Sequence, residues 1–198
     1  MSDISTNNIS VGPCALHLLV AGPQGARDIV LLHGLKFQAA TWQELGTLDV
    51  LAENGCHAIA LDMPGFGRSP ACVEEQDTVL RGIISRKTAG KPVILGPSMG
   101  GRLALEFAIA HPQQISALIL VGAVGVEENR KRLAEIKVPT LLVWGGEDKI
   151  SPLANSDILL TEIAGSKRTI IKGAPHPCYL NQPDTFHAVV LDFLDSLS

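Results

Sequence analysis

The sequence predicts an α/β fold, in which helices cover both faces of a mostly parallel central sheet. Two observations lead to this prediction. Short, continuously apolar runs recur along the chain, and segments with helical spacing lie between them. Continuous apolar runs are typical of strands buried on both faces, and their alternation with helices is typical of parallel sheets. The chain has 198 residues, of which 46% are hydrophobic. We therefore expect one domain over residues 1–198, with residues 1–12 as a segment that can be flexible.

The first half of the chain supplies three expected strands and two helices. Residues 16–21 are expected to form an edge strand, and residues 28–32 a buried strand that ends at His33. Residues 41–53 have helical spacing and stop at an Asn-Gly pair. A strand at 57–61 and a helix at 74–87 follow, the helix with apolar residues on one face.

The second half continues the alternation to the end of the chain. Strands are expected at 92–95, 115–121, 140–144 and 168–171. Helices are expected at 102–111, 127–136, 153–163 and 184–197. We find no repeats, low-complexity stretches or linkers in the sequence, which agrees with a single domain.

The most informative motif is Gly96-x-Ser98-x-Gly100, which lies between an apolar strand and a helix. A serine between glycines at such a turn is typical of a nucleophile elbow. The tight turn strains the serine backbone and projects its hydroxyl into a cleft, so residues without a side chain are favoured beside it. Ser98 is therefore the candidate nucleophile.

A serine hydroxyl needs a general base and an acid that orients the base. Active sites of parallel sheets lie at the carboxyl ends of the strands. His176 follows the last expected strand, and Asp148 follows the strand before it. Glu147 is the neighbouring rival for the acid. The order Ser98, Asp148, His176 differs from that of the two common serine-protease arrangements.

Two backbone N–H groups are candidates for stabilising an oxyanion. One belongs to Met99, which follows the nucleophile, and the other to Leu35, which follows His33-Gly34 at the end of a strand. The next residues, Lys36 and Phe37, are candidates for lining the substrate cleft. A surface lysine and a packing phenylalanine are equally acceptable interpretations of these two.

The chain resembles the α/β-hydrolase superfamily through five motifs. They are Leu32-His33-Gly34, Asp62-x-Pro64-Gly65-x-Gly67-x-Ser69, the Gly96-to-Gly101 elbow, Gly145-Gly146-Glu147-Asp148, and His176. The segments around His33-Gly34-Leu35 and His176-Pro177-Cys178 are similar to the small, lid-less group called α/β-hydrolase domain-containing protein 14. The resemblance implies a soluble intracellular serine hydrolase that acts on small acyl esters or acylated amines. It also implies nucleophile Ser98, acid Asp148 and base His176.

Many members of this superfamily carry a helical lid between the strands expected here at 115–121 and 140–144. In this chain the connection holds only the charged helix at 127–136, so we expect no lid domain and an open cleft. An open cleft suits a small acyl group, with water as the acceptor. Two alternatives remain: transfer of the acyl group to another acceptor, and a non-catalytic protein that uses the fold to bind a ligand or a protein.

Composition and charge indicate which partners the protein is not expected to bind. The net charge of −4 gives no reason to expect binding to nucleic acid or to an anionic membrane. No apolar run is long enough to span a membrane, and residues 1–10 lack a signal-peptide core. We expect no cofactor and no metal.

The four cysteines, Cys14, Cys56, Cys72 and Cys178, show no ligand spacing and are interpreted as reduced thiols of a cytoplasmic protein. Cys178 is read as a packing residue and not as a thiol nucleophile. The charged run 127–132 is interpreted as a solvated helix face, with a protein-docking surface as the alternative. The oligomeric state and the natural substrate stay open.

Overall fold

The computed structural model describes residues 3–197. Its contacts divide the chain into two compact units, with the division between Ile94 and Leu95. Each unit is described by itself below, and the expectation of a single domain over residues 1–198 stays a prediction.

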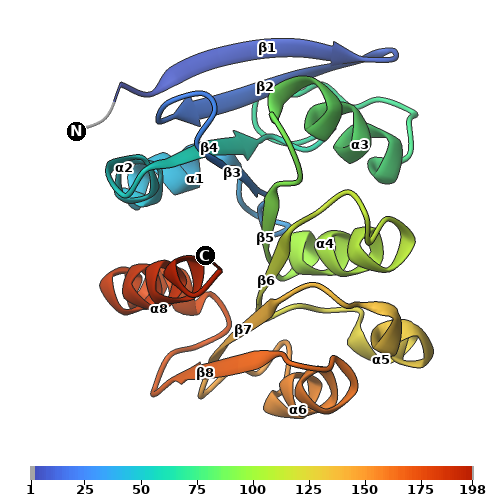
Figure 1. Ribbon diagram of the computed structural model, residues 1–198, viewed down its shortest axis with the longest axis vertical. Helices are drawn as coiled ribbons and strands as arrows, with labels where there is room; N and C mark the ends of the chain where they lie inside the picture. Colours follow the sequence, from blue (N-terminus) through green and yellow to red (C-terminus); the bar gives the residue numbers. More distant parts are fainter. Residues whose placement is uncertain (1–2, 198) are drawn as a thin grey trace. The chain divides into compact units, whose positions relative to one another are not determined.

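The first unit contains four strands: β1 (Ser5–Val11), β2 (Cys14–Ala21), β3 (Arg27–Leu31) and β4 (Cys56–Leu61). Their order is β1-β2-β4-β3 (Figure 1). The β1–β2 and β2–β4 pairs are antiparallel, and the β3–β4 pair is parallel. β4 is buried at every residue, as the apolar run predicts for a strand covered on both faces.

Strand β1 corrects two expectations of the sequence. The segment within residues 1–12 is a seven-residue strand paired along its whole length with β2, and β1 is the outer strand, not β2. The sequence signal is weak because only Val11 of β1 is buried and most of its other residues are polar. Lys87 in α3 (Gln76–Lys87) also donates a hydrogen bond to Asn7 of β1.

The helices of the first unit lie on both sides of its strands, with α3 on one side and α1 (Ala39–Glu44) and α2 (Thr47–Glu53) on the other (Figure 1). The single helix expected at 41–53 is wrong. The chain breaks at Gly46, whose φ of 72° lies in the left-handed region that favours glycine. The apolar spacing continues across the break, because both short helices bury apolar residues, Trp42 in α1 and Leu48 and Leu51 in α2.

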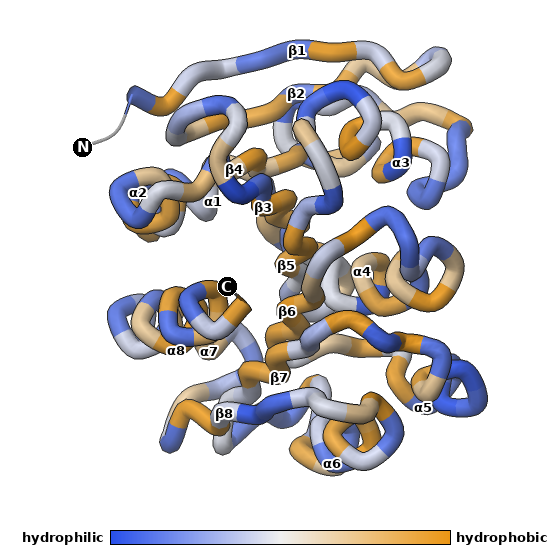
Figure 2. Tube along the Cα trace, viewed as in Figure 1, coloured by the Kyte–Doolittle hydropathy of each residue, from blue (hydrophilic) through white to orange (hydrophobic). Residues whose placement is uncertain are grey.

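The second unit contains β6 (Ala117–Val121), β7 (Thr140–Gly145) and β8 (Lys167–Ile171), and it receives the end of β5 (Val93–Pro97), which crosses the division. The β6–β7 and β7–β8 pairs are parallel. Every residue of β6 and β7 is buried, and Figure 2 shows these strands as hydrophobic along most of their length. This is the core that the continuous apolar runs predict.

Helices also cover both sides of the strands in the second unit. α4 (Met99–Ala110), α5 (Val126–Asn129) and α6 (Leu153–Glu162) lie on one side, and α8 (Pro183–Asp195) lies on the other (Figure 1). A short helix, α7 (Cys178–Asn181), precedes α8 and was not expected from the sequence.

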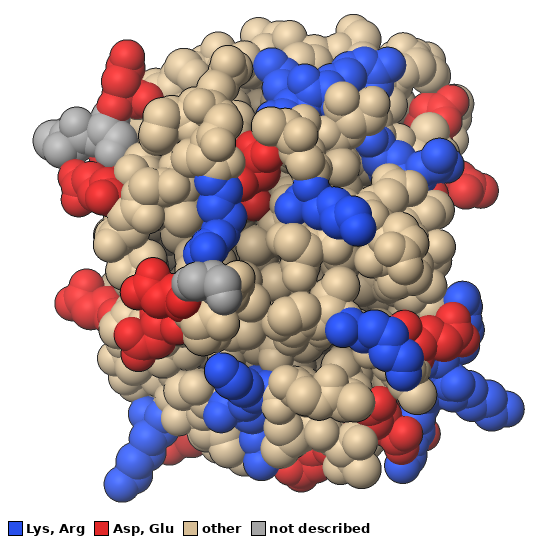
Figure 3. Space-filling model, viewed as in Figure 1, with Lys and Arg blue, Asp and Glu red and all other residues tan. Residues whose placement is uncertain are grey.

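The connection from β6 to β7 holds only α5 and a 3₁₀ helix, η1 (Arg130–Glu135). The continuous α-helix expected at 127–136 is therefore wrong in type, although the segment is helical throughout most of its length. No lid domain is inserted there within the described part of the chain. The charged side chains of this connection are exposed and form ion pairs such as Arg132 with Glu135. Acidic and basic groups lie next to one another on the lower right of Figure 3.

The cysteines correct another expectation. Cys14, at the start of β2, forms a disulfide with Cys72, with the two Cα atoms 5.5 Å apart. Cys56 and Cys178 are buried and belong to no disulfide in the described part of the chain. The bridge joins residues 58 positions apart, and no short-range spacing in the sequence indicates such a pair. With this disulfide the cysteines no longer support the expected cytoplasmic location, because structural disulfides persist in oxidising compartments.

None of the helices in residues 3–197 combines the length and the apolar character that crossing a bilayer would require.

Candidate active site

Ser98 occupies the turn between β5 and α4. Its φ of 52° makes it the only residue other than glycine with a positive φ in the range 3–197. The Ser98 N–H donates a hydrogen bond to the carbonyl of Val121 in β6, which helps to hold the strained turn. A side chain at Gly96 would collide with the backbone of Gly100, so the turn requires glycine there. The local geometry is the strained, projecting serine that the motif predicts.

His176 lies in the loop after β8, and its ring contacts both other candidate residues. Its Nε2 lies 2.8 Å from the Oγ of Ser98, and its Nδ1 lies 2.7 Å from Oδ2 of Asp148. A carboxylate only accepts hydrogen bonds, so Nδ1 is the protonated nitrogen. Nε2 is then free to accept the proton of the Ser98 hydroxyl.

Asp148 is held at the end of β7 by the backbone that follows it. Its Oδ1 accepts hydrogen bonds from the N–H groups of Ile150 and Ser151, both at 2.8 Å. Its side chain is completely buried, whereas Glu147 is exposed. Both carboxylate oxygens are thus occupied, and the carboxylate is fixed toward His176.

The acid has two supporting residues that the sequence analysis missed. The Ser151 hydroxyl donates to the carbonyl of Ala123 at 2.6 Å, and the Ser151 carbonyl accepts from the indole of Trp144. Gly122, with φ of 53°, lies against the pair: a Cβ there would be 3.1 Å from Oδ2 of Asp148 and 3.3 Å from the His176 ring. Only its place directly after an apolar strand could have drawn attention to Gly122.

Cys178 lies two residues after His176 and is the competing nucleophile considered from the sequence. Burial raises the pKa of its thiol to about 12, and the charge of Asp148 acts in the same direction. The thiol is therefore protonated near neutral pH and is a poor nucleophile. The structure agrees with its interpretation as a packing residue.

The expected oxyanion donors fall in different units. Met99 is the first residue of α4, so its N–H is among those at the helix start that have no acceptor within the helix. Leu35 lies in the loop after β3, and its side chain is 62% exposed. Each is described only within its own unit, and the role of both as a pair stays a prediction.

Lys36 and Phe37, the expected cleft residues, line a cavity of about 510 Å³ in the first unit. Leu35 also lines it, together with Phe66 from the loop after β4. Lys36 is exposed and Phe37 is partly buried, and their role in a substrate cleft stays a prediction. Both belong to a cavity wall.

Comparison with known proteins identifies the family. The model of the family described as the alpha/beta hydrolase fold matches residues 29–134, which cover more than half of the chain. The chain belongs to the α/β-hydrolase family. A relative from Rattus norvegicus, named "Putative protein-lysine deacylase ABHD14B", is 35% identical over 99% of this chain and 98% of its own length. This α/β hydrolase thus belongs with the ABHD14 group that its sequence resembles.

Solved structures agree with this assignment. A protein from Thermoplasma acidophilum, described as a predicted CIB-like hydrolase, has a TM-score of 0.93 and 27% identity, and the match covers 98% of this chain and 99% of that one. A serine hydrolase from Cycloclasticus zankles has a TM-score of 0.89 at 20% identity, with 98% and 99% covered, which shows a shared fold. The α/β-hydrolase fold expected from the sequence is confirmed.

Proposed function

We propose that this α/β hydrolase is a serine hydrolase that cleaves small acyl esters through an acyl-enzyme. The observation that carries the proposal is the continuous hydrogen-bonded chain from Ser98 through His176 to Asp148, with distances of 2.8 and 2.7 Å. Three such groups act as a unit in many unrelated hydrolases, and they are recognised by geometry. The buried acid and the strained serine add to this support.

In the first half-reaction, Ser98 Oγ attacks the acyl carbonyl carbon while its proton moves to Nε2 of His176. Asp148 stabilises the imidazolium that forms. The Met99 N–H, at the start of α4, is one proposed donor to the oxyanion; the Leu35 N–H remains the second candidate from the sequence. When the tetrahedral intermediate collapses, Nε2 gives the proton to the leaving alcohol, and the acyl group stays on Ser98.

In the second half-reaction, water replaces the alcohol. His176 takes a proton from the water as its oxygen attacks the acyl carbonyl carbon, and the proton then returns to Ser98 Oγ as the carboxylic acid leaves. Apart from the substrate and water, these steps use only groups of this chain, so the proposal includes no cofactor and no metal ion. The partner it requires is a small acyl substrate.

Acyl amides of lysine are a second substrate class. The observation that favours them is the 35% identity to a relative named for protein-lysine deacylation. The amine leaving group takes its proton from His176 Nε2 in the same step as an alcohol would. Transfer of the acyl group to an acceptor other than water, and ligand binding without catalysis, are the alternatives to hydrolysis.

The proposal is tested by steady-state hydrolysis of p-nitrophenyl acetate and of an acetyl-lysine peptide. Ser98→Ala should lower kcat by roughly 10⁶-fold if the three residues act as a unit. Ser166→Ala is a matched control, because this serine lies outside the hydrogen-bonded chain and close to the start of β8. Full turnover by Ser98→Ala would contradict the proposal. Hydrolysis of the ester but not of the peptide by the wild-type protein would restrict the proposed substrates to esters.

A further inference from the structure

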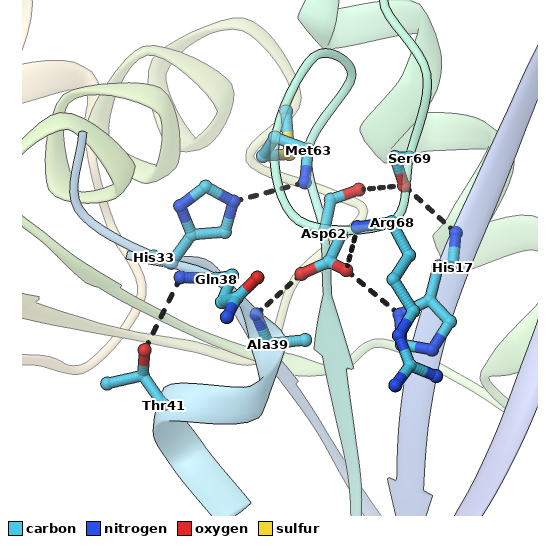
Figure 4. A network of polar contacts seen from close by, with 9 residues as sticks. All are labelled: His17, His33, Gln38, Ala39, Thr41, Asp62, Met63, Arg68 and Ser69. Atoms are coloured by element: carbon cyan, nitrogen blue, oxygen red, sulfur yellow. Dashed lines mark hydrogen bonds and ion pairs between the residues drawn. The ribbon is translucent and has the colours of Figure 1, made fainter. Parts of the chain in front are cut away.

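Buried serine hydroxyls join separate segments of the backbone in each unit. In the first unit, the Ser69 hydroxyl donates a hydrogen bond to the carbonyl of Asp62 at 2.7 Å and accepts one from the N–H of His17 at 2.9 Å (Figure 4). These contacts hold the loop after β4 against β2. They include no residue of the hydrogen-bonded chain that carries the proposed function, so they bear on the stability of the first unit.

The serine of this kind in the second unit is Ser151, which lies in the turn that also holds Asp148. It is 0% exposed, and its hydroxyl donates to the carbonyl of Ala123 at 2.6 Å. The same oxygen accepts a hydrogen bond from Nδ2 of Asn155 at 2.9 Å. Since Asn155 is the donor in that contact, the hydroxyl proton of Ser151 points to Ala123. Ser151 thus joins the acid turn to residues 121–124, called the bridging segment below.

The bridging segment also holds the nucleophile. The carbonyl of Val121 accepts the N–H of Ser98 at 2.9 Å, and the N–H of Val124 donates to the carbonyl of Ser98 at 3.3 Å. Ala123 packs against the start of α4 so closely that a Cβ on Gly101 would lie 2.7 Å from the Ala123 Cβ. The backbone of Ser98 is thus bonded on both sides to one segment, whose place fixes the place of Ser98.

The same segment contacts the acid and the base. Asp148 is bound through Oδ1 to the N–H of Ser151 and through Oδ2 to the ring of His176. A Cβ on Gly122, in the bridging segment, would lie 3.1 Å from Oδ2 of Asp148 and 3.3 Å from the ring of His176. A shift of Ser151 relative to the bridging segment therefore moves Asp148, and with it the imidazole that faces Ser98.

We propose that Ser151 is a positioning residue for the activation of Ser98. Its hydroxyl holds Asp148 and His176 at the distance from the nucleophile at which Nε2 takes the Ser98 proton. The inference rests on the proposed function, because a reactive Ser98 is its readout. As a completely buried side chain, Ser151 acts through Asp148 on one side and through Ala123 on the other.

Ser151→Ala removes the hydroxyl and keeps the backbone N–H that binds Asp148. The buried carbonyl of Ala123 then loses its donor, which is unfavourable. We therefore expect the acid turn and the bridging segment to separate, and the contact between Ser98 and His176 to lengthen. Proton transfer requires the two groups to lie within hydrogen-bond reach, so the nucleophile should react more slowly.

Ser156 in α6 provides a matched control within the same unit. It is also 0% exposed, and its hydroxyl donates to the carbonyl of Leu153 at 2.7 Å and accepts from Arg168 at 2.8 Å. These partners belong to α6 and β8, and not to the bridging segment. Ser156→Ala and Ser151→Ala should therefore both lose buried hydrogen bonds, and only the second should slow the reaction of Ser98.

The experiment measures the rate constant for modification by a fluorophosphonate, followed by intact mass against time. Urea unfolding gives the folded fraction of each protein, and each rate constant is expressed per folded molecule, so that a loss of stability does not explain a change. For Ser151→Ala we expect the rate constant to fall about tenfold, as for a small misplacement of reacting groups. For Ser156→Ala it should stay within about twofold of wild type.

Asn155→Asp tests the same contact if Ser151→Ala does not fold. Asn155 is the third residue of α6, where the helix dipole favours a carboxylate. A carboxylate there only accepts hydrogen bonds, and it attracts the proton of the Ser151 hydroxyl more strongly than the carbonyl of Ala123 does. The rate constant should fall in the same direction, by about threefold or more.

A wild-type rate constant in Ser151→Ala, or in Asn155→Asp if the first variant does not fold, would overturn the inference and leave the proposed function intact. An equal fall in Ser156→Ala would do the same. A folded wild-type protein that gives no adduct would overturn the proposed function, and the inference with it.

Discussion

His176 donates a hydrogen bond from Nδ1 to Oδ2 of Asp148 at 2.7 Å. The adjacent carboxylate, on Glu147, is exposed and takes no part in this contact. The difference comes from the turn after β7, in which the backbone N–H groups of Ile150 and Ser151 bind Oδ1 of Asp148. The backbone of this turn therefore fixes Asp148, and not the neighbouring Glu147, in contact with His176.

Asp148→Asn is expected to lower kcat for a small ester by about 10⁴-fold, because an amide can hold His176 in the wrong tautomer. Glu147→Gln is the control and should change kcat by less than about twofold. Steady-state kinetics on both variants, with far-UV circular dichroism to check folding, measures this. The reverse ranking would show that Glu147 is the acid.

Gly122→Ala is expected to lower kcat and to destabilise the protein. The added Cβ would lie 3.1 Å from Asp148 Oδ2 and 3.3 Å from the His176 ring, and the positive φ adds about 1–3 kcal/mol of strain. Urea unfolding and ester kinetics on the same preparation separate the two effects.

Gly165→Ala is the matched control for this change. Its φ of 76° imposes similar backbone strain, but nothing lies within 4 Å of the added Cβ. Both variants should lose stability, and only Gly122→Ala should lose kcat. An equal kcat in the two variants would mean that Gly122 does not fix the separation of Asp148 and His176.

The Cys14–Cys72 disulfide predicts two reactive thiols in unreduced, denatured protein and four after reduction. Ellman titration in guanidinium counts them. The double variant Cys14→Ser, Cys72→Ser should lose about 2–4 kcal/mol of unfolding free energy, because the cross-link restricts the unfolded chain. Reduced wild-type protein is the control and should match the double variant. Four thiols before reduction would contradict the disulfide.

His33 predicts a loss of stability in mild acid. Burial lowers the pKa of His33 below its usual value, whereas the carbonyl of Gly34 and the charge of Asp62 oppose this shift. In the unfolded chain a histidine titrates near about 6.5. As the pH falls from about 6.5 toward the lowered pKa, the unfolded state binds a proton that the folded state does not, so the free energy of unfolding decreases.

Urea unfolding at pH 7.5 and 5.5 measures this effect. The decrease should be smaller in His33→Gln than in wild type. His187→Gln is a second test, because burial also lowers the pKa of His187. His187 should contribute to the decrease in the free energy of unfolding independently of His33. A decrease in His33→Gln as large as in wild type would contradict the assignment to His33.

The sequence predicts those parts of the fold whose residues are buried on all sides. The strands β4, β6 and β7 lie within a residue or two of the apolar runs that indicate them. β1 escapes prediction because it is mostly polar, and its pairing with β2 depends on a partner that follows it in the chain. The break between α1 and α2 depends on the conformation of Gly46, which hydrophobic spacing does not report.

The same distinction holds for the candidate site. Ser98, Asp148 and His176 are predictable because each follows a strand and carries a reactive group. Gly122 and Ser151 support them through backbone conformation and contacts with residues distant in sequence, for which no local pattern exists. The disulfide between Cys14 and Cys72 escapes prediction for the same reason.

The central claim is that His176 activates Ser98 as a nucleophile. Intact mass spectrometry after exposure to a fluorophosphonate probe tests it most directly, with Ser98→Ala beside the wild type. We predict one adduct per wild-type chain and none on the variant, since no other serine has this contact with a histidine among residues 3–197. An unmodified, folded wild-type protein, or an adduct that persists on Ser98→Ala, would contradict the claim.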